Sequence, residues 1–220
     1  MGARAEVEKV MKKMLKGFDY MDVKEIPQID LYMDQVLTFM GEHLRSTTRN
    51  PDTDKILTKA MVNNYVKNKV IIPPVKKKYG TDHVLLLTVV YYMKNFLTID
   101  DIRRIITPVS DRYARPSTYS VESHGGKRRR YTLSDIYTEV FDDVKKSTDH
   151  LADEVRDKLD IAEKSFADAP EADRDMLQRF DLICQLCGDI YVRKLLIEKL
   201  IDEVCTEVEP EKTSKKNEHR

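Results

Sequence analysis

Polar side chains recur along a short segment, residues 59–67, at spacings that place them on one side of a helix. They are Lys59, Asn63, Asn64 and Lys67. An asparagine can form paired hydrogen bonds with the N6/N7 edge of adenine, and a lysine reaches phosphates or guanine. The apolar residues of the segment fall on the other side: Met61, Val62, Tyr65 and Val66. This pattern favours a helix that packs on a core and offers nucleic-acid-binding groups to solvent.

A basic segment follows this helix closely. Ile71-Ile72-Pro73-Pro74 predicts an extended backbone, after which come Lys76, Lys77, Lys78 and then Tyr79. An extended basic ribbon beside a short polar-faced helix is typical of a winged helix-turn-helix, in which the helix enters the major groove and the wing contacts the backbone. In the alternative interpretation, the asparagines are ordinary surface residues and the lysines form a solvated loop.

The distribution of charge supports an anionic partner. The 220 residues have a formal net charge of zero, but residues 55–131 contain 16 Lys and Arg against 5 Asp and Glu, a net of +11. Residues 132–209 contain 10 against 21, a net of −11. We therefore expect separate roles for the two halves, with the basic half binding the anionic partner.

Motifs for other chemistry are missing from the sequence. There is no glycine-rich phosphate loop, no HExxH and no nucleophile with an evident base, so we expect no enzyme, no catalytic residues, no cofactor and no metal. Cys184 and Cys187 have CxxC spacing inside a helical pattern; we expect small buried thiols rather than a redox or metal site. His83 opens an apolar helix, where a capping or core-edge role outweighs a ligand role.

Several negative observations predict a cytoplasmic protein. No apolar run approaches the roughly 18 residues of a membrane span. The N-terminal residues lack the apolar centre of a secretion signal, and Glu6 departs from the myristoylation pattern. We therefore expect no contact with a membrane.

Hydrophobic periodicity predicts a mainly α-helical chain with five regions. These are an N-terminal amphipathic helix (1–20), a winged helix-turn-helix domain (21–108), a basic flexible loop (109–131), an acidic helical hairpin (132–207) and a disordered tail (208–220). Helices are expected over 3–16, 29–44, 58–67 with Thr58 as the N-cap, from Thr81 through an apolar run, and over 99–107 with Thr98 and Asp101 as a capping box. The apolar run is hydrophobic on most faces, which predicts the centre of a core.

The loop and the hairpin offer two further candidate surfaces. Within the loop, Lys127, Arg128, Arg129 and Arg130 either clamp phosphates as a flexible arm or stay solvated. One apolar stripe runs from Leu133 to Phe166 and a second from Leu177 to Val204, which predicts a long antiparallel hairpin. The first stripe either forms a dimer interface or packs against the second.

Residues 58–106 resemble the DNA-binding domain of MerR-type regulators. The matching pieces are Tyr65, Ile71-Ile72-Pro73-Pro74, Lys77, Tyr79, the helix over 82–95 and LTIDDIRRII at 97–106. Residues 25–107 are more closely similar to the YkrK-like bacterial family, described as having a MerR-like helix-turn-helix. The sequence departs from the MerR pattern at Asn64, where many members have Arg, at Val70, where a Gly precedes the hydrophobic pair, and in the longer segment 29–57.

The resemblance implies a DNA-binding transcriptional regulator that dimerises through a long helix after the DNA-binding domain. In this hypothesis Asn63, Asn64 and Lys67 contact bases, and Lys76–Lys78 with Tyr65 and Tyr79 hold the duplex backbone. The alternative is a helical protein-interaction module that keeps the winged-helix fold without DNA binding, and whose basic half docks an acidic partner or the acidic helices of its own second half.

Overall fold

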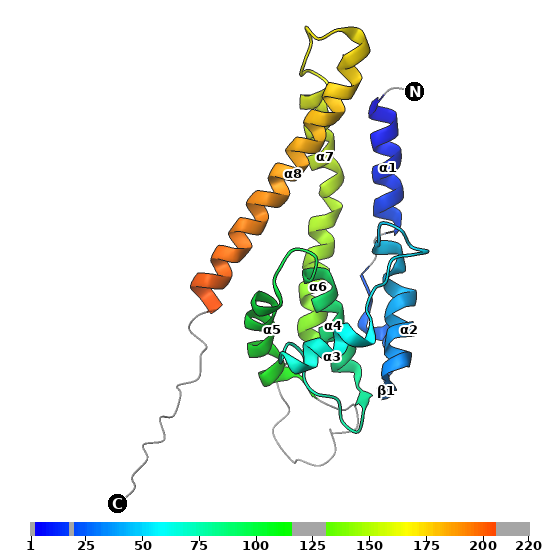
Figure 1. Ribbon diagram of the computed structural model, residues 1–220, viewed down its shortest axis with the longest axis vertical. Helices are drawn as coiled ribbons and strands as arrows, with labels where there is room; N and C mark the ends of the chain where they lie inside the picture. Colours follow the sequence, from blue (N-terminus) through cyan, green and yellow to red (C-terminus); the bar gives the residue numbers. More distant parts are fainter. Residues whose placement is uncertain (1–2, 18–19, 116–130, 206–220) are drawn as a thin grey trace, which may run out of the picture.

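The computed structural model describes residues 3–17, 20–115 and 131–205, which are mainly helical and include one small antiparallel sheet (Figure 1). The elements in chain order are α1 (Ala3–Gly17), η1 (Val23–Glu25), β1 (Leu31–Tyr32), α2 (Met33–Leu44), η2 (Arg45–Thr47), α3 (Lys59–Lys67), β2 (Lys78–Tyr79), α4 (Thr81–Met93), α5 (Ile99–Tyr113), α6 (Leu133–Asp149), α7 (Leu151–Ala162) and α8 (Glu171–Val204). The predicted basic arm at 127–130 and the tail at 208–220 lie outside the described residues.

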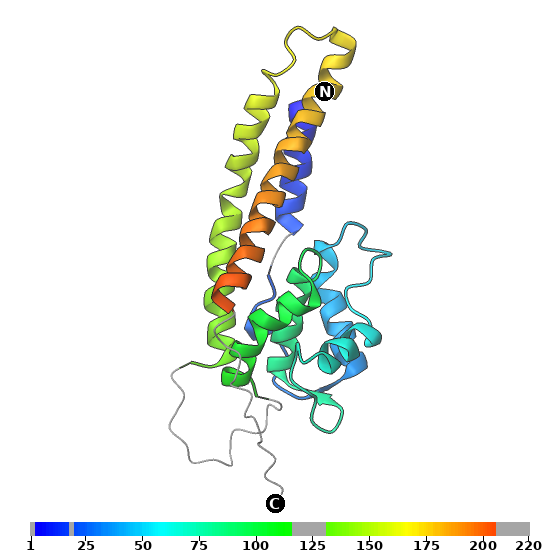
Figure 2. The same ribbon diagram turned by 60° about the vertical axis from the view of Figure 1, so that its left-hand side comes forward.

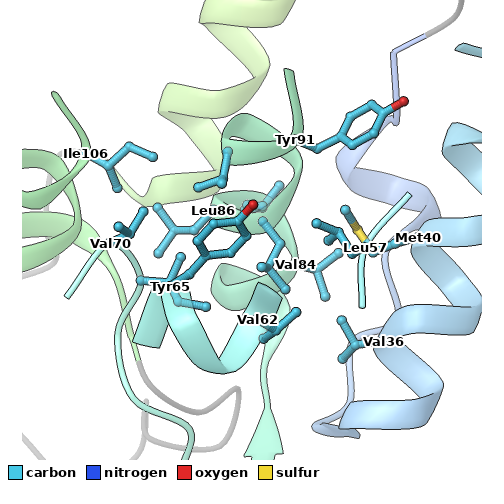
Figure 3. Packing of buried hydrophobic residues seen from close by; sticks show 14 of the residues in the cluster. Val36, Met40, Leu57, Val62, Tyr65, Val70, Val84, Leu86, Tyr91 and Ile106 are labelled. Carbon is cyan, nitrogen blue, oxygen red and sulfur yellow. The ribbon is translucent and has the colours of Figure 1, made fainter. Parts of the chain in front are cut away.

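Helix α4 lies at the centre of the main core, as its apolar sequence predicted. Its residues from His83 to Thr88 are all buried, together with Val90 and Tyr91. Figure 3 shows Val62 and Tyr65 of α3 pointing toward Val84 of α4. Because a helix buried on most sides must be surrounded by other elements, α4 fixes the positions of α2, α3 and α5 around it.

The sequence predicted a helix over the whole segment 29–44, but the helix begins only at Met33. The sheet explains the difference. Leu31 pairs with Tyr79 and Tyr32 with Lys78, so β1 and β2 form an antiparallel pair. Helix α2 starts only at Met33, because the backbone N–H of Tyr32 donates to Oε1 of Gln35 at 2.8 Å and closes the helix N-terminus there. Leu31 is buried and anchors the extended segment.

Helix α5 is longer than the predicted 99–107. The predicted cap is confirmed, because Oγ1 of Thr98 accepts from the backbone N–H of Asp101 at 3.2 Å. The helix then continues through Pro108 to Tyr113. Ile102, Ile106 and Ser110 are buried at four-residue spacing, so packing of this face outweighs the hydrogen bond that the proline removes.

The second half forms the predicted helical hairpin, in which α8 runs antiparallel to α6 and α7 (Figure 2). The base of the hairpin belongs to the main core, since Leu133, Tyr137 and Ile201 are buried in the same cluster as the helices around α4. Arg104 of α5 donates to the carbonyl of Ile201 at 2.9 Å and pairs with Asp202 at 3.0 Å. The helices on the two sides of the predicted 109–131 loop therefore share one core.

Helix α1, expected as a lone amphipathic helix, packs beside the hairpin (Figure 1). Its Val7 contacts a second small cluster that contains Leu159 of α7 and Leu182 of α8. Arg4 pairs with Asp160 at 2.7 Å. The amphipathic pattern of this segment thus serves packing within the chain.

Candidate nucleic-acid interface

Helix α3 has the two faces that its sequence predicted. Oγ1 of Thr58 accepts from the backbone N–H of Met61 at 3.2 Å and caps the helix. Val62 and Tyr65 are buried against the core. The polar residues Lys59, Asn63, Asn64 and Lys67 are all exposed.

Two of these exposed side chains interact within the protein. Nζ of Lys59 lies 2.7 Å from Oδ1 of Asp34 on α2. Nδ2 of Asn68 donates to Oδ1 of Asn64 at 2.8 Å. Both partners are on the surface, where such contacts are weak and exchange readily with water or a ligand. Asn63 and Lys67 are thus the more accessible pair on this face.

The end of α3 is built differently from the expectation. The departure from the MerR glycine was expected at Val70, but the left-handed residue is Lys69, with φ 58°. Val70 is fully buried, and its N–H donates to the carbonyl of Tyr65 at 2.8 Å. A left-handed residue just past a helix end is usually glycine. Sequence analysis missed Lys69, which is exposed beside the candidate residues.

The predicted basic ribbon is a tight hairpin turn rather than an extended segment. Val75 and Lys78 exchange both backbone hydrogen bonds, at 3.1 and 2.9 Å. Between them, Lys76 has φ 50° and Lys77 has φ 64°. Two central residues with positive φ define the type I′ turn, which normally contains Asn-Gly. The turn places two exposed lysines at its tip.

A buried histidine holds the base of this turn. His83 is fully buried, and its Nδ1 accepts from the N–H of Gly80 at 3.1 Å. The other ring nitrogen, Nε2, therefore donates to the carbonyl of Pro73 at 3.3 Å. Burial lowers the pKa of His83, which keeps the ring neutral. The expected capping role is confirmed.

The structure places both candidate tyrosines in the core. Tyr65 is 6% exposed and Tyr79 is 4% exposed. Burial raises the pKa of both hydroxyls. The ring of Tyr79 lies edge-on to that of His83, with centroids 5.2 Å apart. We therefore assign both rings to positioning of the surface residues and leave them out of the proposed contact set.

The polar candidates of α3 and the turn other than Lys59 and Asn64, which contact Asp34 and Asn68, are called the basic surface, together with Lys69. It comprises Asn63, Lys67, Lys69, Lys76, Lys77 and Lys78. Lys78 is half-buried, with its ammonium 5.2 Å from the ring centroid of Tyr32. Oγ1 of Thr107 on α5 donates to the carbonyl of Lys69 at 3.3 Å. Residues of three helices and the sheet thus position the turn and the end of α3.

The second half departs from expectation at its cysteines. Cys184 and Cys187, expected as buried thiols, are both exposed on α8. Within residues 3–17, 20–115 and 131–205, no cluster of three or more His, Cys, Asp or Glu side chains is arranged to hold a metal ion. None of the helices in this described part combines the length and the apolar character needed to cross a membrane.

Residues 21–124 match the model of a protein family described as a domain of unknown function (DUF1836). The matched range begins before β1 and includes α3, the hairpin turn and α4, so the whole basic surface lies inside the family domain. The base of this domain packs on the hairpin, which lies outside the matched range. No curated protein and no solved structure matches the chain significantly.

Proposed function

We propose that the protein is a transcriptional regulator that binds duplex DNA with a winged helix-turn-helix. In this proposal α3 enters the major groove, where Asn63 and Lys67 contact base edges. The turn at Lys76–Lys77 acts as a short wing that contacts phosphates of the adjacent backbone. The resemblance of residues 58–106 to the DNA-binding domain of MerR-type regulators supports this arrangement.

The observation that supports the proposal most is the backbone of the turn. A non-glycine residue with positive φ costs about 1 kcal/mol or more, and this turn has two such lysines side by side. Asn-Gly would form the same turn without strain. Retaining two long cations at a position that penalises them indicates that their charge has a use, and phosphate contact is the use that such a wing has.

The local positive charge also supports binding of DNA. The basic surface lies within residues 55–131, whose net charge is +11. Clustered lysines attract a polyanion and release its condensed counterions on binding, so affinity falls as salt rises. Lys67, Lys76 and Lys77 are exposed and extend into solvent.

A titration of full-length protein onto labelled random-sequence duplex, followed by fluorescence anisotropy from about 50 to 200 mM salt, tests this proposal. We expect the affinity of the wild-type protein to fall steeply as the salt concentration rises. In Lys76→Ala/Lys77→Ala the salt slope should be shallower, by the amount that corresponds to about two lost phosphate contacts. Lys9→Ala/Lys13→Ala removes two exposed lysines of α1 and is the control. Equal salt slopes for the two variants would contradict a role for the turn.

The second candidate is a helical protein-interaction module that keeps this fold without DNA binding. The contacts of Lys59 with Asp34 and of Asn64 with Asn68 favour it, because they engage two side chains proposed to approach bases. Absence of duplex binding at the lowest salt, for a correctly folded sample, would support this candidate over the first.

A further inference from the structure

A long row of exposed apolar side chains lies on α8. The stripe expected to close the hairpin, from Leu177 to Val204, is mostly exposed instead. We use the name outer face for six exposed residues on one side of α8: Met176, Phe180, Ile183, Cys187, Ile190 and Tyr191. Phe180 is 62% exposed, Ile190 65% and Tyr191 67%. Monomeric soluble proteins rarely expose large apolar side chains in such a continuous row.

The hairpin itself uses another side of the same helix. Leu182 is 5% exposed and packs with Leu159 of α7, and Leu186 adds to that cluster. The outer-face residues recur at steps of three and four, so they share a side, about a third of a turn from Leu182. Closing the hairpin therefore leaves the outer face uncovered by the described residues.

Small residues interrupt the row of large ones on the outer face. Cys187 lies on this face, and Cys184 and Gly188 lie beside it on the same helix. A Cβ added at Gly188 would have nothing within 4 Å. Small residues allow the backbones of two helices to approach closely, and the larger residues then pack around the crossing. In a two-fold contact each copy presents the same patch, so an apolar face of this kind can pack against its own copy.

We propose that the outer face of α8 binds a second copy of this chain, with the two α8 helices crossing at Cys184–Gly188. The proposal is independent of DNA binding. It places the contact on α8, whereas the resemblance to MerR-type regulators had pointed to the stripe of α6 and α7.

The area of the face is enough for a small interface. Its five large residues are each more than half exposed and offer on the order of 100 Å² apiece. Together they contribute roughly 500 Å² per copy and about 1,000 Å² for the pair, which is close to the lower limit for a specific interface.

Charge also favours a second copy over a charged partner. The hairpin segment 132–209 has a net charge of −11, yet none of the six outer-face residues is an Asp, Glu, Lys, Arg or His. A basic or acidic partner would find no opposite charge on this face. An identical apolar face leaves no charge buried without a partner when the two surfaces meet.

Sedimentation equilibrium of the full chain tests the proposal. We expect a dimer, and a rise of the dimer dissociation constant by roughly a hundredfold or more in Phe180→Glu/Ile183→Glu, because each copy then buries two charges. Val192→Glu is the control, since Val192 is 63% exposed but one residue off the outer face. Circular dichroism checks that each variant stays helical. A monomer at about 100 μM for the unmodified chain, or a dimer unchanged by Phe180→Glu/Ile183→Glu, would overturn the proposal.

Disulfide trapping with a mild thiol oxidant locates the crossing. In a Cys205→Ser background, Cys184 or Cys187 should join two copies through a disulfide, because both exposed thiols lie at the proposed crossing. Replacing both by Ser, with Cys205 restored, should abolish the covalent dimer. A covalent dimer through Cys205 alone, or none in the Cys205→Ser background, would contradict the crossing.

Discussion

Nε2 of His83 donates to the carbonyl oxygen of Pro73 across 3.3 Å, and this hydrogen bond joins the start of α4 to the segment that leads into the hairpin turn. The opposite ring nitrogen accepts from the N–H of Gly80. One neutral, fully buried imidazole thus satisfies backbone groups on both sides of the turn. The position of Lys76 and Lys77 relative to α3 depends on it.

This arrangement predicts loss of stability in mild acid. The pKa of His83 lies below its ordinary 6.5 in the folded chain, so below that pH the unfolded chain binds more protons. The free energy of unfolding should fall as pH drops through about 6.5, at up to about 1.4 kcal/mol per pH unit until the folded pKa is reached.

Urea unfolding at pH 7.5, 6.5 and 5.5 measures this effect. In His83→Gln the extra slope between pH 6.5 and 5.5 should disappear, while stability at pH 7.5 falls by about 1–3 kcal/mol because buried backbone groups lose partners. Wild type and His83→Gln with the same pH slope would show that the ring does not titrate as inferred.

The strained turn predicts a variant that gains stability and loses affinity for DNA. Lys76→Asn/Lys77→Gly keeps the type I′ turn, removes both charges and relieves two positive-φ positions. The free energy of unfolding should rise by about 1 kcal/mol or more. Thermal unfolding measures the gain, with Lys76→Ala/Lys77→Ala as the control that removes the same charges but keeps the strain.

In the DNA titration these two variants should be equally weak. If the Asn-Gly variant instead bound like wild type, the charge at the tip would have no part in binding. If it were no more stable than the Ala variant, the turn would not be strained.

The buried base of the hairpin predicts cooperative unfolding of both halves. Ile201 of α8 is 3% exposed in the main core, whereas its neighbour Leu200 is 50% exposed. Ile201→Ala should lower the free energy of unfolding by about 2–4 kcal/mol in a single transition, and Leu200→Ala should change it little. Urea unfolding followed by circular dichroism measures both, and two separate transitions in wild type would show that the halves unfold independently.

The contact of α1 with the hairpin predicts a local effect. Val7 packs on Leu159 and Leu182, while Val10 on the same helix is 67% exposed. Val7→Asp should detach α1 and expose it to proteolysis, and Val10→Asp should not. Limited trypsin digestion with mass spectrometry compares the two, and equal cleavage rates would mean that α1 is not held by Val7.

Local signals in the sequence predicted most of the helices. Thr58 and Thr98 cap where expected, α4 is central, and the face of α3 buries Val62 and Tyr65. These features depend on neighbours within a few residues, which periodicity and capping rules describe. The predicted start of α2 was wrong, because Leu31 pairs with Tyr79, which is distant in the chain.

The candidate site was predictable in its residues but less so in its geometry. The lysines and asparagines of α3, and Lys76 and Lys77 of the turn, are exposed as the polar pattern indicated, whereas Lys78 is half-buried. The positive φ values of Lys69, Lys76 and Lys77 could not be predicted, since lysine does not favour them and surrounding packing imposes them. The direction of the α8 stripe was also missed, because periodicity finds an apolar side without showing what covers it.

The shared core makes the hairpin a rigid lever. Tyr137 of α6 and Ile201 of α8 lie in the same cluster as Tyr65 of α3. Helix α8, about 50 Å long, extends away from this shared core. A small rotation at the distant tip, where α1 also attaches, therefore becomes torque on the helix proposed to read DNA. Mechanical leverage of this kind needs no flexible joint between the two ends of the molecule.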